Sequence, residues 1–166
     1  MKLNSLQDLL TFEIHDLLSA EKQMLQVYPK IVQSIAHKEL KEILEKNQRQ
    51  TVIQEQRLEQ CLQKMNLPVH PGRSHGMIGI ISSWMELQGS EAQPDVRDAA
   101  SIALVQQMAH YQIAGYGCAH AFAESTELPE VAGLLRQTLL EEEEFDRALT
   151  EIAENVVNQE AELHTR

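Results

Sequence analysis

The sequence predicts an all-α protein, a four-helix bundle in which a long crossover carries a short fifth helix. Four long segments repeat apolar residues at steps of three and four positions, which is the pattern of one buried helical face. Glycine (7) and proline (5) are few and aromatic residues make up only 4%, so strands and turns are disfavoured relative to helices. Short joints link these segments in two pairs, and a longer stretch, residues 66–94, separates the pairs.

The first pair of helices is expected over residues 4–37 and 38–65. Ser5, followed three positions later by Asp8, predicts a capped start. Pro29 lies inside the first pattern and predicts a bend, because proline removes a backbone donor. The second pattern stops before Pro68, since the residue preceding a proline disfavours helix.

The crossover is expected to hold a loop and then a short helix over residues 77–88, which Gly89 ends. This helix is rich in large apolar side chains, among them Met77, Ile78, Trp84 and Met85. They could cover the end of the bundle, or they could form a contact with a second copy of the chain.

The second pair is expected from Pro94 or Asp95 to Ala123 and over residues 129–162, with Pro129 at the first helical position. Residues 1–3 and 160–166 are expected to fray, and residues 1–166 to form a single domain. The long connection between two tightly joined pairs can return the chain along the bundle. This is the connectivity of ferritin-like bundles rather than of a simple up-and-down series.

Composition excludes several classes of function. The 25 acidic and 14 basic residues give a net charge of −11, which disfavours binding to nucleic acid or to an anionic membrane. No stretch is long and apolar enough to predict a membrane span, and the first residues lack the core of a signal peptide. Cys61 and Cys118 are too few for a disulfide scaffold and are predicted to be small core residues. We therefore expect a cytoplasmic protein.

Polar residues interrupt all four apolar faces at similar depth. Glu21 lies on the face of the first helix, and Glu142 lies on that of the last, with Asp146 one turn further on. Asn47, Thr51, Gln54 and Gln112 occupy such positions on the other two helices. Facing carboxylates in a bundle core are typical of a dinuclear iron or manganese centre. The alternative is a hydrogen-bonded polar layer without metal.

Histidine placement argues against a complete dinuclear centre. Such a centre normally uses four carboxylates and two histidines, with Glu-x-x-His on two of its helices. None of the seven histidines has a glutamate three positions before it: His15, His37, His70, His75, His110, His120 and His164.

Several short motifs, in order along the chain, resemble the YciE/YciF family of ferritin-like proteins. They are AEKQ at 20–23, VRDAA at 96–100, HYQIAGYG at 110–117, and Glu141 and Glu142 followed by Asp146. The resemblance covers about residues 3–158. It implies a bacterial, cytoplasmic, stress-associated protein that forms ferritin-like helical dimers and has no settled biochemical activity.

Departures from the family pattern share one direction, which is the loss of potential metal ligands. Asn47 stands where the family usually has histidine, Gln50 and Gln112 where it has glutamate, and Ala109 also replaces a glutamate. Ser82 and Ser83 replace a pair of glutamates that is common in the crossover helix. The resemblance therefore implies a degenerate metal site. Its residual ligands would be Glu21, Glu142 and Asp146, which bind either no metal or one divalent cation weakly.

Two functions follow as expectations. The first is a non-catalytic, stress-associated homodimer with a structural or protein-binding role, in which Glu21 is protonated or is satisfied by Gln54, Gln112 or a nearby hydroxyl. The second is a metalloprotein that oxidises or sequesters iron, or consumes peroxide, through an iron or manganese pair. A shell component of an oligomer is a third, weaker possibility.

Overall fold

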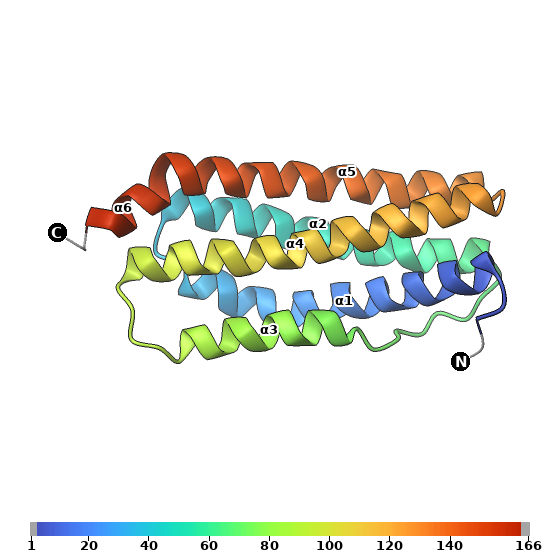
Figure 1. Ribbon diagram of the computed structural model, residues 1–166, viewed down its shortest axis with the longest axis horizontal. Helices are drawn as coiled ribbons and strands as arrows, with labels where there is room; N and C mark the ends of the chain where they lie inside the picture. Colours follow the sequence, from blue (N-terminus) through green and yellow to red (C-terminus); the bar gives the residue numbers. More distant parts are fainter. Residues whose placement is uncertain (1–2, 164–166) are drawn as a thin grey trace.

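The computed structural model describes residues 3–163, and within them the chain is helical throughout apart from short connections (Figure 1). The long helices are α1 (Leu6–Ser34), α2 (Lys38–Lys64), α4 (Pro94–Ser125) and α5 (Pro129–Ile152). The short helix α3 (His75–Gln88) lies in the crossover. A π-helical turn, η1 (Ala153–Val157), and α6 (Asn158–Leu163) continue α5. The predicted all-α fold is confirmed.

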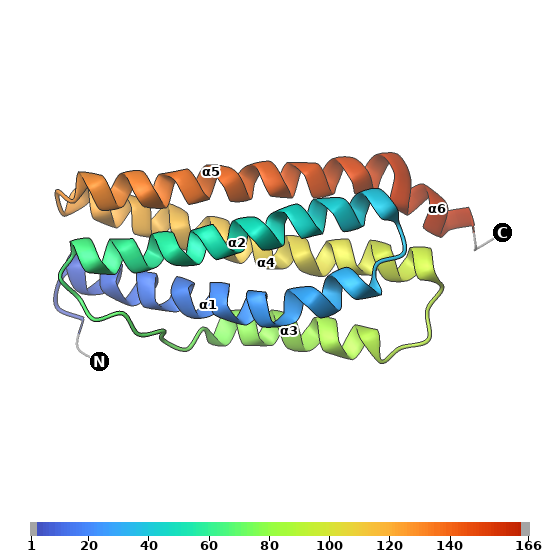
Figure 2. The ribbon, with the colours of Figure 1, turned by 180° about the vertical axis from the view of Figure 1, so that it is seen from behind.

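Each long helix packs beside two others, in the order α1, α2, α5 and α4 around the bundle. Neighbours run antiparallel, and the crossover returns the chain along the bundle so that α4 starts at the end where α1 finishes (Figures 1 and 2). Helix α3 lies outside this square, against α1 and α4. The predicted connectivity is therefore present.

Local signals explain most helix ends. Ser5 and Asp8 form the predicted capping box, in which the side chain of each residue accepts a hydrogen bond from the backbone N–H of the other. Pro94 and Pro129 begin α4 and α5, where their missing N–H has no helical partner to lose. Helix α1 continues through Pro29.

Some boundaries differ from those predicted. The first helix ends at Ser34 rather than at residue 37, because His37 instead caps α2 by accepting the N–H of Leu40. Helix α3 begins at His75 rather than at residue 77, preceded by Ser74. The last helix is not regular: the π-helical turn adds a residue to one turn, and Val157 within it is buried. Residues 160–163, expected to fray, are helical in α6, and residues 1–2 and 164–166 lie outside the described part of the chain.

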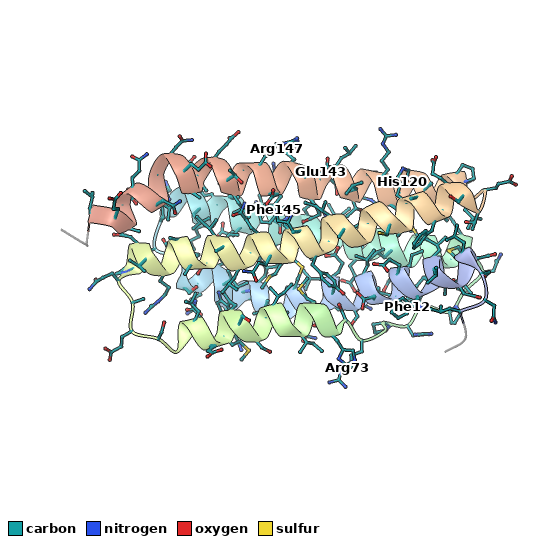
Figure 3. The ribbon with its side chains drawn as sticks, viewed as in Figure 1. Phe12, Arg73, His120, Glu143, Phe145 and Arg147 are labelled. Atoms are coloured by element: carbon teal, nitrogen blue, oxygen red, sulfur yellow. The ribbon has the colours of Figure 1, made fainter. Side chains whose placement is uncertain are left out.

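The core is divided along the bundle into two apolar clusters. The first includes Ile35, Leu40, Ile102 and Ile152, at the end of the bundle where α1 passes into α2. The second includes Leu10, Leu62, Ala123 and Val131, at the opposite end. Phe145, labelled in Figure 3, belongs to the first cluster, whereas Arg147 projects from the outer face of α5. Between the clusters, all four long helices contribute buried polar side chains.

None of the helices over residues 3–163 combines the length and the apolar character that crossing a membrane requires.

Candidate functional site

The buried side chains between the two apolar clusters form what we call the central polar layer. Its members are buried to at least nine-tenths, and every long helix supplies at least one of them: Glu21, Asn47, Thr51, Gln54, Arg57, Gln112, Thr138 and Glu142. Helical periodicity predicts all of these residues except Arg57 on inward faces, and Thr138 lies in the same predicted series as Glu142.

Glu21 of α1 is held by α4. Its Oε1 accepts a hydrogen bond from Gln112 Nε2 at 2.9 Å and another from the hydroxyl of Tyr116 at 2.5 Å. Its Oε2 is buried without a hydrogen-bond partner. Burial, reinforced by the negative charge of Glu142, raises the pKa of Glu21 to about 8, although both hydrogen bonds oppose the shift. The prediction that Gln112 or a hydroxyl satisfies Glu21 fits this geometry, and Gln54 turns to Glu142 instead.

Glu142 of α5 is held by α2. Its Oε1 accepts a hydrogen bond from Gln54 Nε2 at 2.7 Å, and its Oε2 has no partner. Burial raises the pKa of Glu142 to about 7, Glu141 adds to the shift, and the amides of Gln54 and Asn47 oppose it. Both buried carboxyls therefore hold their protons at pH values where an exposed glutamate is ionised.

The side-chain oxygens of Gln54 and Gln112 are also buried without partners. The layer thus contains four unpartnered oxygen atoms, two from carboxyls and two from amides. A proton on a carboxyl group turns one of its oxygens into a donor, and an amide oxygen is the natural acceptor for it. A layer with more acceptors than donors therefore favours the protonated form of its carboxyl groups.

An ion pair between the buried Arg57 and the half-buried Glu141 lies at the side of the layer between α2 and α5. Arg57 donates to both carboxylate oxygens of Glu141, at 2.8 and 3.1 Å, and to Thr138 Oγ1 at 2.6 Å. Although burial acts to raise it, the pKa of Glu141 is lowered, because Arg57, Gln50 and Gln54 stabilise the charged form. Glu141 is therefore already paired with a cation of the chain itself, the guanidinium of Arg57.

A small cavity of about 80 Å³ lies between α2 and α5 and reaches the layer. Asn47 forms part of its wall, together with Ile43, Glu141 and Phe145. The Oδ1 atom of Asn47 accepts a hydrogen bond from the hydroxyl of Tyr28. The cavity has room for several water molecules, and it brings the surface close to the otherwise enclosed Glu142 side of the layer.

The three predicted ligands do not lie together as a set. Glu21 and Glu142 both lie in the layer, and the negative charge of Glu142 contributes to the raised pKa of Glu21. Asp146 is half-buried and engaged elsewhere: its Oδ1 accepts a hydrogen bond from Gln106 and lies 3.4 Å from His110 Nε2. Among residues 3–163, no group of three histidine, cysteine or acidic side chains is placed to hold a metal ion.

The layer does not fit a dinuclear centre. Only two of its members are carboxyls, and the others that offer oxygen are neutral amides and hydroxyls. No histidine in the described part of the chain is buried. Neutral amides compete poorly with carboxylates for hard cations. The unpartnered oxygens of the layer together carry too little negative charge to hold two divalent ions.

Arg57 was missed because a lone arginine near a helical stripe usually extends to solvent. Its spacing of three from Gln54, which is itself three from Thr51, places it on the inward face and was the available signal. Asp98 was also missed as a buried residue. It accepts the backbone N–H groups of Ala36 and His37 at the turn between α1 and α2. Its partners lie about 60 positions earlier, beyond any local pattern.

Comparison with known proteins agrees with the all-α bundle described above. Residues 5–162 match the family described as "Domain of unknown function (DUF892)". The chain therefore belongs to this family, and the resemblance to the YciE/YciF family is confirmed.

Two relatives show how close the match is. Protein YciF of Escherichia coli strain K12 is 32% identical over 163 residues, which are 98% of each chain. The crystal structure of this E. coli stress protein superposes with a TM-score of 0.89, over 94% of the present chain and 99% of that one.

Two further structures extend the comparison. YcfI of Rhodopseudomonas palustris, for which a structural role has been suggested, is 28% identical with a TM-score of 0.87, over 90% of this chain and 95% of that one. A Xanthomonas campestris protein shares only the fold, at 20% identity and a TM-score of 0.74, over 98% of this chain and 100% of that one.

Proposed function

We propose that this member of the YciF-like stress protein family is a non-catalytic structural or protein-binding protein, built on a ferritin-like bundle whose dinuclear metal site is degenerate. The observation that carries the proposal is the donor set of the central polar layer. Two carboxyls with raised pKa values face two amides, and the third acid nearby, Glu141, is neutralised by Arg57. Hydrogen bonds in this layer do the structural work that metal ions would do in a complete centre.

The test is oxidation of added ferrous iron by oxygen and, separately, by hydrogen peroxide. We expect the protein to leave the rate at that of buffer alone. A matched Glu21→Gln, Glu142→Gln double variant should behave like the natural chain. Oxidation that is faster with the natural chain than with this variant would contradict the proposal.

A single divalent cation is the second candidate, because the two unpartnered carboxyl oxygens of the layer, on Glu21 and Glu142, are the kind of ligand that hard cations prefer. The sequence-based set with Asp146 supports it less, since Asp146 is bonded to Gln106. Manganese titration followed by electron paramagnetic resonance distinguishes the two. Saturation at one ion per chain that Glu142→Gln abolishes would favour the cation.

We further propose that the protein is a cytoplasmic homodimer, and that the outer face of α3 contributes to the contact. Support comes from its apolar character: Ile78 and Ile81 are half-buried, and Met85 is 56% exposed. Together with Gln23, Val27 and Lys30 of α1, they line a shallow groove. A negative charge of −11 makes a basic partner protein more favourable than an acidic one.

A further inference from the structure

Helix α3 is attached to the molecule differently from the other helices. Only Met77 and Trp84 of its 14 residues are buried, whereas every long helix buries a continuous face. Residues 65–74 and 89–93 join it to α2 and α4 without further helix (Figure 1). Elements with few buried apolar contacts open at lower free energy than the core does. What keeps α3 in place must therefore be found at specific contacts.

In the loop before the helix, the Gly72 N–H donates to the carbonyl of His15 and the ring of His70 stacks on that of His15. The hydrogen bonds directly at the start of α3 gather at one residue, Ser74. Its hydroxyl donates to Asp16 Oδ2 of α1 at 3.0 Å and lies 2.9 Å from the hydroxyl of Tyr111 on α4. Tyr111 in turn donates to the same Asp16 oxygen at 2.5 Å. The backbone N–H of Ser74 donates to Ser19 Oγ at 3.0 Å. We call Asp16, Ser74 and Tyr111 the latch.

The side chain of Ser74 does not cap the helix that it precedes. Ser74 stands at the N-cap position of α3, yet its side chain makes no capping hydrogen bond and is turned to Asp16 instead. Serine at this position normally accepts an N–H of its own helix. Here it joins α3 to two other helices, and it is completely buried.

Close approach of the backbone completes the arrangement. A Cβ atom at Gly76 would lie 2.4 Å from Cε2 of the Tyr111 ring, so only glycine lets the start of α3 rest against that ring. At Gly79, one turn later, a Cβ atom would meet nothing within 4 Å. Helix α3 therefore contacts the latch at Gly76, in its first turn. At Gly79, in contrast, there is room for an added side chain.

The other end of α3 is held by apolar contact and local bonds. Gly89 and Ser90 donate their N–H groups to carbonyls of Glu86 and Leu87 in the same helix. Trp84, the only tryptophan of the sequence, is 3% exposed and packs in the first apolar cluster. Its indole Nε1 is buried without a partner, so this docking is less complete than that of the latch.

We propose that residues 66–93 form a strap that opens from the bundle as a unit while the four long helices stay folded, and that the latch of Asp16, Ser74 and Tyr111 keeps it closed. The strap covers the seam between α1 and α4. Glu21 bridges the same seam through Gln112, the residue that follows Tyr111. Opening of the strap would expose the outer side of the α1–α4 seam, where Asp16 and Tyr111 lie, to solvent.

The test compares Gly76→Ala with Gly79→Ala, two identical substitutions in the same helix. Hydrogen exchange of the α3 amides and acrylamide quenching of Trp84 fluorescence report the strap, and far-ultraviolet circular dichroism reports the bundle. Gly76→Ala should speed exchange in α3 on the order of tenfold and raise quenching, with helix content unchanged. Gly79→Ala should leave both unchanged or slow the exchange, because alanine favours helix.

Tyr111→Phe, which removes only the hydroxyl from the latch, should reproduce the effect of Gly76→Ala. Tyr28→Phe, which removes the hydroxyl that donates to Asn47 of the central polar layer, should not. The strap is contradicted if Gly76→Ala and Tyr111→Phe leave α3 exchange unchanged, or if the long helices exchange faster together with α3. Light scattering on the same samples reports the oligomeric state separately, so that failure of the proposed dimer and failure of the strap are distinguishable.

Discussion

At the scale of single residues, the protonation of Glu21 and Glu142 governs how the core responds to pH. Both carboxyls have pKa values raised above the 4.5 of an exposed glutamate, Glu21 to about 8 and Glu142 to about 7. At these two groups the folded chain therefore binds more protons than the unfolded chain between pH 4.5 and 8. The stability that they contribute is highest at the acidic end of this window and falls as pH rises through it.

We predict that Glu21→Gln flattens this fall. A glutamine keeps the size of a protonated glutamate and cannot ionise, so the free energy of unfolding should lose much of its decline from pH 5 to 8, on the order of several kcal/mol in the natural chain. Urea unfolding at a series of pH values measures it. A slope that is the same in both proteins would show that Glu21 is ionised in the folded state throughout.

Arg57 and Glu141 provide a second prediction at this scale. Arg57→Met should lower the free energy of unfolding by about 1–3 kcal/mol, because the partly exposed carboxylate of Glu141 loses its charge-assisted hydrogen bonds. Adding Glu141→Gln should recover part of the loss. Lys46→Ala, which removes an exposed partner of Glu144, is the control and should change stability by about 0.5 kcal/mol or less.

The residues of the layer show where sequence reasoning succeeds and where it stops. Glu21, Gln54, Gln112 and Glu142 follow from helical periodicity alone, because each replaces an apolar residue on a repeating face. Their pairing does not follow, since it depends on how four helices are rotated relative to one another. Cys118 was predicted to be buried and is exposed, although its neighbour Ala119 is fully buried.

At the scale of elements, the turn between α1 and α2 depends on a residue of α4. Asp98 is 1% exposed, and its carboxylate accepts N–H groups of Ala36 and His37 at 2.7–3.2 Å. These N–H groups lie where α2 begins, so Asp98 fixes the start of α2 and ties the first helix pair to the second. Sequence indicated that the chain turns there, but not which distant side chain holds the turn.

We predict that Asp98→Asn lowers the free energy of unfolding by about 1–3 kcal/mol, since an amide offers only one acceptor oxygen and places a donor against backbone N–H groups. Glu91→Gln, in the exposed loop before α4, is the matched control and should be neutral. Chemical denaturation of both variants measures the difference. Equal stability of the two variants would mean that the turn between α1 and α2 does not depend on the carboxylate of Asp98.

At the scale of the whole molecule, the order and direction of the helices could be predicted from the sequence, but the irregular end of the last helix could not. Tight joints and a long crossover specified which helices are neighbours in sequence and antiparallel. The π-helical turn at Ala153–Val157 was unpredicted, because an extra residue in a turn leaves almost no trace in a helical pattern. Burial of Val157 against the core is its visible consequence.

Assembly is the prediction that belongs to this scale. If the exposed face of α3 packs against a second copy, Met85→Glu should weaken the dimer at least tenfold, because it places a charge in an apolar contact. Leu140→Glu is the control, since Leu140 is 52% exposed on α5, away from that face. Sedimentation equilibrium measures both. A monomeric natural chain would rule out the dimer and leave the fold untouched.

The central claim is that a bundle of a kind suited to paired metals here holds a hydrogen-bonded, partly protonated layer instead. Anomalous diffraction from crystals grown with ferrous iron or manganese tests it most directly, because it locates metal ions without assuming their ligands. The account predicts no pair of anomalous peaks among Glu21, Gln54, Gln112 and Glu142. Two strong peaks a few ångströms apart at that depth of the bundle would contradict it.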